Sequence, residues 1–263
     1  MIRSSSIAGT GSHWTALYAG DNTLIIEFGN SIERATVDRV NTLDALLKDA
    51  CADSTLTGIL ETVTTFRSLA IIYDACVLHP QTLLEQIRTL EASEVSNAGL
   101  FTAQRHWQLP VLYGEQAGPD LNSVAELTGL DTEHVIQLHS EHHYSAYMLG
   151  FLPGYAFLGD TPSALHLPRR TEPRLRVPAG SVAIAMQLTG VYPWESPGGW
   201  HILGNCPVPM FDSQLSPPSV LRAGDRVSFR RIDKTEFDAL KNEPDIQQQD
   251  RSRWAKHEHT NNE

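Results

Sequence analysis

Arginines are the residues in the middle of this chain best suited to binding chemistry. Four of them lie close together: Arg169, Arg170, Arg174 and Arg176. No lysine occurs between Lys48 and Lys234, so an anion bound here would meet arginine or backbone N–H groups. A guanidinium binds carboxylate or phosphate through two parallel hydrogen bonds. The cluster predicts a site for a small carboxylate or a phosphate, and the alternative is a solvated loop paired with acidic neighbours.

The arginines lie in a stretch, Gly150 to Gly204, that holds 8 of the 18 glycines and 7 of the 15 prolines. Proline fixes φ and glycine permits positive φ, so this density predicts short strands joined by tight turns. The turns after Thr189 and around Ser196 would present backbone N–H groups beside hydroxyls and aromatic rings, which suits an anion. The alternative is that these turns only join strands, with Trp200 as a core anchor.

Other catalytic arrangements receive little support from the sequence. His139 and His143 would share a face of a helix four residues apart, but the pattern after His142 looks extended and no third ligand is near. We therefore predict no metal site. No G-x-S-x-G elbow occurs and no cysteine lies in a motif, so the catalytic residue stays unassigned.

Motifs for nucleotide and carrier cofactors are also missing from the sequence. The chain has neither the G-x-x-x-x-G-K-[ST] loop nor the dinucleotide fingerprint. No lysine stands in a Met-Lys-Met context, so we expect no covalently bound biotin. If ATP or a carboxylated cofactor is used, the sequence does not show the usual machinery for it.

Composition narrows the class of protein. The net charge is −11, whereas nucleic-acid binding needs a basic face. No apolar run approaches the roughly 18 residues of a membrane span, and we expect no membrane partner. The three cysteines are far apart and the N-terminus lacks the apolar run of a signal peptide, so we expect a reducing, cytoplasmic compartment.

Two domains are predicted from the periodicity of apolar residues. Residues 13–100 show two strands, a helix over 32–50, two further strands and a helix after Pro80, which is most of a split βαβ, ferredoxin-like α+β unit. Residues 101–235 show many short strands punctuated by Gly and Pro, typical of a β-barrel or sandwich. Asp120 and Asp131 are predicted N-caps of short helices there. Residues 236–263 read as a polar, disordered tail.

Three blocks of this chain resemble a known family: YMLGFLPGYAFLGDTP, LPRRTEPRLRVPAGSV and SPGGWHILG. They are similar to the B subunit of 5-oxoprolinase, a family also called KipI-type kinase inhibitor or allophanate hydrolase subunit 1. LPVLYGE..GPDL and LRAGDRVSF extend the resemblance, which covers most of residues 14–232. It implies a small α+β domain followed by a cyclophilin-like barrel.

The resemblance also implies partners and an activity. Together with the A subunit and the barrel-containing, KipA-type C subunit of 5-oxoprolinase, such a chain helps to open 5-oxo-L-proline to L-glutamate with ATP hydrolysis. ATP with magnesium would be used by the complex and not bound by this chain alone, which would be inactive. The KipI name implies an alternative, inhibition of a sensor histidine kinase. A further alternative is half of a urea- or allophanate-type carboxyltransferase, which the lack of a biotin carrier disfavours.

Substrate-binding residues can be carried over from the family motifs by position. They are His139, Tyr144, Arg169, Arg174, Thr189, Tyr192, Ser196 and Trp200. The resemblance implies that Arg169 and Arg174 hold a carboxylate or phosphorylated intermediate in a pocket between two related barrels. This chain departs from the family in having Met186 in place of a glycine and Leu188 in place of a glutamine.

Overall fold

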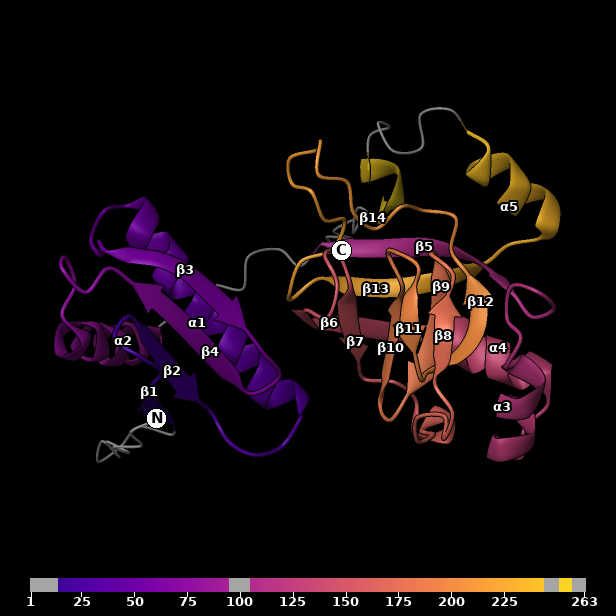
Figure 1. Ribbon diagram of the computed structural model, residues 1–263, viewed down its shortest axis with the longest axis horizontal. Coiled ribbons are helices and arrows are strands. Elements are labelled where there is room, and N and C mark those ends of the chain that lie inside the picture. The colour runs from indigo at the N-terminus through magenta and orange to yellow at the C-terminus, as the bar shows by residue number, and fades with distance from the viewer. Residues whose placement is uncertain (1–13, 95–104, 244–250, 257–263) are drawn as a thin grey trace, which may run out of the picture. The chain divides into compact units, whose positions relative to one another are not determined.

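The computed structural model describes residues 14–94, 105–243 and 251–256 (Figure 1). The chain divides into two compact units, Met1–Ala103 and Gln104–Glu263. The domain limits predicted at residues 13, 100 and 101 lie outside the described residues. None of the helices in the described part of the chain combines the length and apolar character needed to cross a bilayer.

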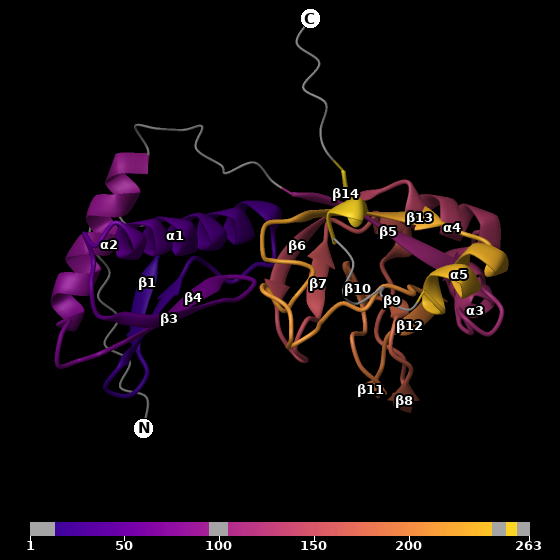
Figure 2. The same ribbon diagram turned by 90° about the horizontal axis from the view of Figure 1, so that it is seen from above.

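The first unit is a four-stranded antiparallel sheet with two helices. Its strands are β1 (Thr15–Tyr18), β2 (Thr23–Glu27), β3 (Ile59–Thr64) and β4 (Ser68–Tyr73), in the order β1-β2-β4-β3. The helices α1 (Arg34–Ala52) and α2 (Pro80–Glu94) cover one face of the sheet (Figure 2). Alternate strand residues such as Leu24, Ile26, Leu69 and Ile71 are buried, because side chains of a strand point to opposite faces in turn.

The connection of these elements accounts for the α+β character of the unit. β4 lies between β2 and β3, the two strands that flank α1, which is the arrangement of a split βαβ unit. The remaining edge is occupied by β1, which precedes β2 in a hairpin. No strand follows α2 within the described residues of this unit. Its assignment to the ferredoxin-like class stays a prediction.

The second unit is built on a closed barrel of seven strands in the order β12-β9-β10-β7-β6-β13-β5, with β5 pairing back to β12. The strands are β5 (His106–Tyr113), β6 (His143–Leu149), β7 (Ala156–Gly159), β9 (Ser181–Ala185), β10 (Leu188–Val191), β12 (His201–Asn205) and β13 (Arg226–Arg231). Closure removes the exposed edges of the sheet. The prediction of a mainly-β barrel is confirmed, and its cyclophilin-like assignment stays a prediction.

The barrel closes at β5. One edge of β5 pairs in parallel with β13. Its other edge pairs with β12 at Leu112 and Tyr113 and with β14 (Ala255–Lys256) at His106 and Trp107. Pro110 lies between these two stretches of pairing, which is where the missing N–H of a proline costs least.

Further elements surround the barrel. β8 (Arg174–Val177) and β11 (Ser196–Gly198) form a separate two-stranded ribbon, which extends from one end of the barrel in Figure 2. The helix α3 (Leu121–Thr128) packs beside β12, and α4 (Thr132–Ser140) packs beside β13. A short 3₁₀ turn, η1 (Ser163–Leu165), precedes the arginine cluster.

The prediction of a disordered tail over residues 236–263 is wrong for the described part of that segment. The helix α5 (Lys234–Lys241) begins after Asp233, whose carboxylate accepts the Glu236 N–H at 2.8 Å. Farther on, η2 (Arg251–Trp254) leads into β14, and Trp254 is buried in the barrel core. Only a few, widely spaced apolar residues of this segment are buried, so its overall composition still reads as that of a polar tail. Residues 244–250 and 257–263 lie outside the described residues.

Candidate functional site

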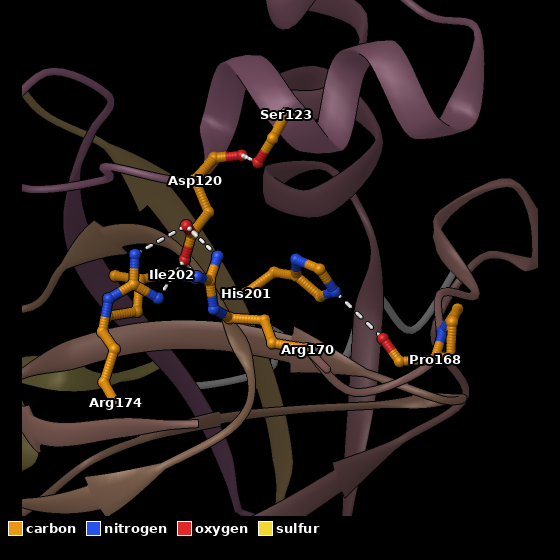
Figure 3. A network of polar contacts seen from close by, with 7 residues as sticks. All are labelled: Asp120, Ser123, Pro168, Arg170, Arg174, His201 and Ile202. Atoms are coloured by element: carbon orange, nitrogen blue, oxygen red, sulfur yellow. Dashed lines mark hydrogen bonds and ion pairs between the residues drawn. The ribbon is translucent and has the colours of Figure 1, made fainter. Parts of the chain in front are cut away.

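The arginine cluster is organised by one buried carboxylate, that of Asp120, which is 3% exposed. Its Oδ1 accepts from Arg170 Nη1 at 2.8 Å and from Arg174 Nη2 at 2.7 Å. Its Oδ2 accepts from Arg174 Nη1 at 2.8 Å and from the Ile202 N–H at 2.7 Å (Figure 3). Arg174 therefore binds the carboxylate through both of its terminal nitrogens, which fixes the direction of the guanidinium.

The backbone before α3 carries Asp120 to this position. The Asp120 N–H donates to Ile202 O at 3.1 Å, so the segment lies directly against β12. A Cβ on Gly118 would lie 1.9 Å from Leu203 O, so only glycine allows this approach. Asp120 is the N-cap residue of α3, as predicted, but its side chain makes no capping bond, because the arginines and Ile202 take up both carboxylate oxygens. The predicted cap at Asp131 is confirmed by its bond with the His134 N–H at 2.8 Å.

Charge at the cluster is positive overall. Burial raises the pKa of Asp120, but hydrogen bonds from Arg174 and Ile202 and the two guanidinium charges outweigh it, so the pKa is lowered. The carboxylate is therefore ionised at neutral pH. Two guanidiniums face this single carboxylate, so the Asp120 cluster, defined as Asp120, Arg170 and Arg174, carries one net positive charge.

The other two arginines differ from this pair. Arg176 pairs with Glu195 at 2.8 Å on the exposed surface. Arg169 is exposed, and among the described residues it makes neither an ion pair nor a hydrogen bond. Burial raises the pKa of the Tyr155 and Tyr192 phenols, and the nearby positive charge of Arg169 opposes that rise. Arg169 thus supplies an uncompensated charge close to two phenol groups.

Tyr192 and Trp200 belong to one aromatic cluster, of which the sequence predicted only these two members. Tyr155 lies at the centre, with ring centroids 5.2 Å from Tyr192 and 6.0 Å from Trp200. Phe151 packs against Tyr155 and Tyr192, is 62% exposed and has a φ of 70°. Tyr155 and Phe151 stand in the GFLPGYAF block, and that block was the signal that could have identified them.

His139, Thr189 and Tyr144 are brought together inside the barrel, where all three side chains are buried. The Thr189 hydroxyl donates to Ala183 O at 3.1 Å, so it accepts from His139 Nε2 at 2.9 Å. His139 Nδ1 is then the acceptor for the Tyr113 hydroxyl at 2.8 Å. The Tyr144 hydroxyl donates to His139 O at 2.9 Å. These residues therefore fix the interior of the barrel in a single hydrogen-bonding pattern.

Ser196 lies in the ribbon that also contains Arg174. It pairs with Val177 across β11 and β8, and Gly198 pairs with Arg174. The Ser196 side chain is buried, and its hydroxyl lies 3.3 Å from Pro197 O. The ribbon thus joins one predicted hydroxyl to one predicted arginine, whereas Arg169 belongs to the loop that precedes it.

The histidines of the HSEHH motif do not form a metal site in this arrangement. α4 ends at Ser140, so His139 and His143 do not share a helix face. Both ring nitrogens of His139 are already hydrogen-bonded. In the parts of the chain that the structure describes, no three His, Cys, Asp or Glu side chains are placed to hold a metal ion.

Comparisons with known proteins identify the family. Residues 14–221 match the family model for the carboxyltransferase domain, subdomain C and D. A Bacillus subtilis (strain 168) protein, named as the B subunit of 5-oxoprolinase, is 37% identical over 232 residues, covering 85% of this chain and 95% of its own. The Escherichia coli O157:H7 protein of the same name is 36% identical over 80% of this chain and 92% of its own. This chain belongs to the family of 5-oxoprolinase B subunits.

Solved structures similar to this family member agree on the fold. TTHA0988 is 36% identical with a TM-score of 0.69, and the match covers 81% of this chain but 40% of that one. PH0987 from Pyrococcus horikoshii is 39% identical with a TM-score of 0.50, over 83% of this chain and 98% of its own. The Kluyveromyces lactis urea carboxylase has a TM-score of 0.63 at 18% identity over 89% of this chain and 23% of its own, which shows a shared fold alone.

Proposed function

We propose that this protein is the B subunit of an ATP-dependent 5-oxoprolinase that opens 5-oxo-L-proline to L-glutamate together with the A and C subunits. Relatives that bear the name of the B subunit support the assignment. The observation that carries it is the Asp120 cluster, because a net positive, rigidly held pair of guanidiniums beside the free charge of Arg169 suits a small carboxylate substrate.

Residue roles in this proposal follow from exposure. Arg169 is accessible and uncompensated, so it binds the substrate carboxylate, and Arg174 supports it from the Asp120 cluster. Tyr192 and Trp200 form the wall beside Arg169. The side-chain polar atoms of His139, Tyr144 and Thr189 are already hydrogen-bonded within the protein, so their role is to position β10 and the barrel wall and not to touch the ligand.

The remaining chemistry belongs to the complex. Opening the lactam adds the oxygen of water to the acyl carbon, breaks the C–N bond and leaves the nitrogen protonated. Hydrolysis of ATP to ADP and phosphate, with magnesium, would supply the driving force, and we assign nucleotide binding to the other subunits because the sequence of this chain has no nucleotide loop. Cys51, Cys76 and Cys206 are all free thiols, in keeping with the cytoplasmic location that we propose for the complex.

Co-expression of the A, B and C subunits tests the function. The complete set should release L-glutamate from 5-oxo-L-proline only when ATP is present. Arg169→Ala should lower kcat/KM by about 100-fold, since a hydrogen-bonded charge pair contributes roughly 1.5–3 kcal/mol. Arg176→Ala is the matched control and should retain activity, because the partner of Arg176 among the described residues is the exposed Glu195. Full turnover without this chain, or with Arg169→Ala, contradicts the proposal.

Exposed apolar side chains favour a second candidate, inhibition of a sensor histidine kinase. Phe151, Leu175 and Trp194 are 62%, 86% and 48% exposed in the Gly150–Gly204 stretch. A protein partner would need these side chains to form one contiguous apolar patch. Autophosphorylation of the kinase with a molar excess of this chain tests the candidate, and an unchanged rate removes it. For the carboxyltransferase alternative, the similarity to urea carboxylase supports a shared fold and nothing about activity.

A further inference from the structure

Two polar atoms beside the Asp120 cluster lack a hydrogen-bond partner among the described residues. They are Arg170 Nε and His201 Nδ1, both enclosed by protein. His201 is 6% exposed, and the Arg170 side chain is 29% exposed, so part of the Arg170 side chain reaches the surface. Leaving a buried donor or acceptor unpaired costs about 1–3 kcal/mol, and most buried polar groups in proteins have a partner.

Local contacts hold the two residues next to each other. His201 Nε2 lies 2.9 Å from Pro168 O, two residues before Arg170. The Arg170 N–H donates to Gly199 O at 2.8 Å, two residues before His201. Figure 3 shows the His201 ring beside the Arg170 side chain. The loop after η1 and the start of β12 are therefore tied together at this point.

The bonds already present decide which atom donates and which accepts. A carbonyl can only accept, so the Nε2 that faces Pro168 O carries the proton, and Nδ1 of the neutral ring is an acceptor. Arg170 Nε is a donor, and its direction is fixed because Arg170 Nη1 is bound to Asp120. The pair thus offers one donor and one acceptor on neighbouring, rigidly held side chains.

We propose that Arg170 Nε and His201 Nδ1 are specificity-determining atoms that bind the lactam edge of 5-oxo-L-proline. A five-membered lactam holds its amide in the cis form, so its N–H and C=O lie on one edge of the ring. The N–H donates to His201 Nδ1 and the C=O accepts from Arg170 Nε, which leaves the carboxylate for Arg169. This inference rests on the proposed function and explains how substrate is told from glutamate, which has no such edge.

Substitutions can separate lactam binding from a purely structural role. Arg170→Lys keeps a cation for Asp120 but removes the Nε donor. His201→Gln keeps an N–H that reaches Pro168 O but removes the acceptor at the Nδ1 position. Each should raise KM for 5-oxo-L-proline in the complete complex by about tenfold or more. His201→Asn places an amide oxygen at the Nδ1 position, so it should be less impaired than His201→Gln.

A structural role predicts the reverse order. If His201 serves only to bind Pro168 O, His201→Gln should match the wild type and His201→Asn should be the weaker variant. That order, or unchanged KM in both Arg170→Lys and His201→Gln with an active wild-type complex, overturns the inference while the proposed function stands.

A binding measurement covers the case in which the wild-type complex has no 5-oxoprolinase activity. 2-Pyrrolidinone, added to the full chain with ¹⁵N-labelled histidine, should shift the His201 Nδ1 resonance, and N-methyl-2-pyrrolidinone, which lacks the N–H, should not. The shift should disappear in His201→Gln. No shift at saturating 2-pyrrolidinone, as expected for a pair bridged by water alone, overturns the inference independently of turnover.

Discussion

His139 illustrates how burial sets the chemistry of a single residue. Its ring stacks on Phe229 with centroids 4.6 Å apart, and both nitrogens are bonded. Burial, together with the neighbouring His142, lowers the pKa of His139 from 6.5 to about 3. The side chain is therefore a neutral structural group at any physiological pH, which excludes it from work as a proton carrier.

Acid sensitivity of the fold follows from His139. Between pH 6.5 and 3 the unfolded chain binds a proton at this residue that the folded chain does not, so stability falls as pH falls through this window. The contribution is at most about 1.4 kcal/mol per pH unit. His139→Gln should unfold more easily at pH 8 but show a shallower loss between pH 6 and 5, measured by urea unfolding.

A second histidine provides the control for this experiment. His79 is exposed and makes no side-chain ion pair or hydrogen bond among the described residues, so His79→Gln should retain the wild-type pH slope. An identical slope in wild type and His139→Gln would show that other groups cause the acid sensitivity.

At the same scale, the sequence predicted some of the residues that the structure groups together, and their role as a binding site stays a prediction. Arginines in a Gly- and Pro-rich stretch indicated anion recognition, and Tyr192 and Trp200 both pack against one further ring, that of Tyr155. The partner of Arg174 could not be predicted, because Asp120 stands 54 residues earlier, directly before a helical pattern that a cap would also explain. Burial of His139 was equally hidden, since a motif residue can be a ligand contact or a core group.

The turn between β9 and β10 requires a backbone conformation that its residue, Met186, does not favour. Met186 stands at its tip with a φ of 57°, in the left-handed region that favours glycine, and its side chain is 57% exposed. Its N–H donates to Leu167 O, which holds the backbone in this form. The family glycine expected at this position would fit the turn without strain.

Met186→Gly should therefore stabilise the protein. A non-glycine residue in the left-handed region costs roughly 1–2 kcal/mol, and the flexibility of glycine in the unfolded chain offsets part of that gain. We expect a net increase of about 0.5–1 kcal/mol in the free energy of unfolding. Gln187→Gly, one residue along, should give no increase because its backbone is outside that region; an equal gain there would contradict the explanation.

Helices with repeated apolar positions or a clear cap could be predicted from the sequence, whereas a short helix with few apolar residues could not. α1 and α2 carry repeated apolar positions, and the Asp131 cap marked the start of α4. α5 has only eight residues, and its buried side chains are Phe237 and Leu240. So few anchors cannot be told from a polar tail until the surface they pack on is known.

At the scale of the whole molecule, Trp254 packs in the barrel core and so holds the end of the described chain against the barrel. It is buried, and β14 directly after it pairs with β5. Trp254→Ala should lower the free energy of unfolding of the second unit by about 3 kcal/mol, as for other large core side chains. Trp194→Ala removes a tryptophan that is 48% exposed and packs on Phe211, so it should lower the free energy of unfolding by only about 1 kcal/mol. Equal effects in denaturant unfolding would show that Trp254 is not an anchor.

The many short strands in the sequence predicted a β-barrel or sandwich, but the sequence did not show which strands pair to close the barrel. β13 joins β6 to β5, and its register with β5 pairs Phe229 with Leu109. Pairing over such a separation depends on tertiary packing, which no local pattern encodes.

The late position of β13 has a consequence for biosynthesis. Arg226 follows Tyr113 by 113 residues, which takes a ribosome roughly 6–23 s. During this interval the edge of β5, and later the edge of β6 once that strand is made, lack the strand that joins them. Unpaired apolar edges favour association between nascent chains. Slower translation lengthens this exposure, so chaperone capacity and growth temperature should govern the yield of folded protein.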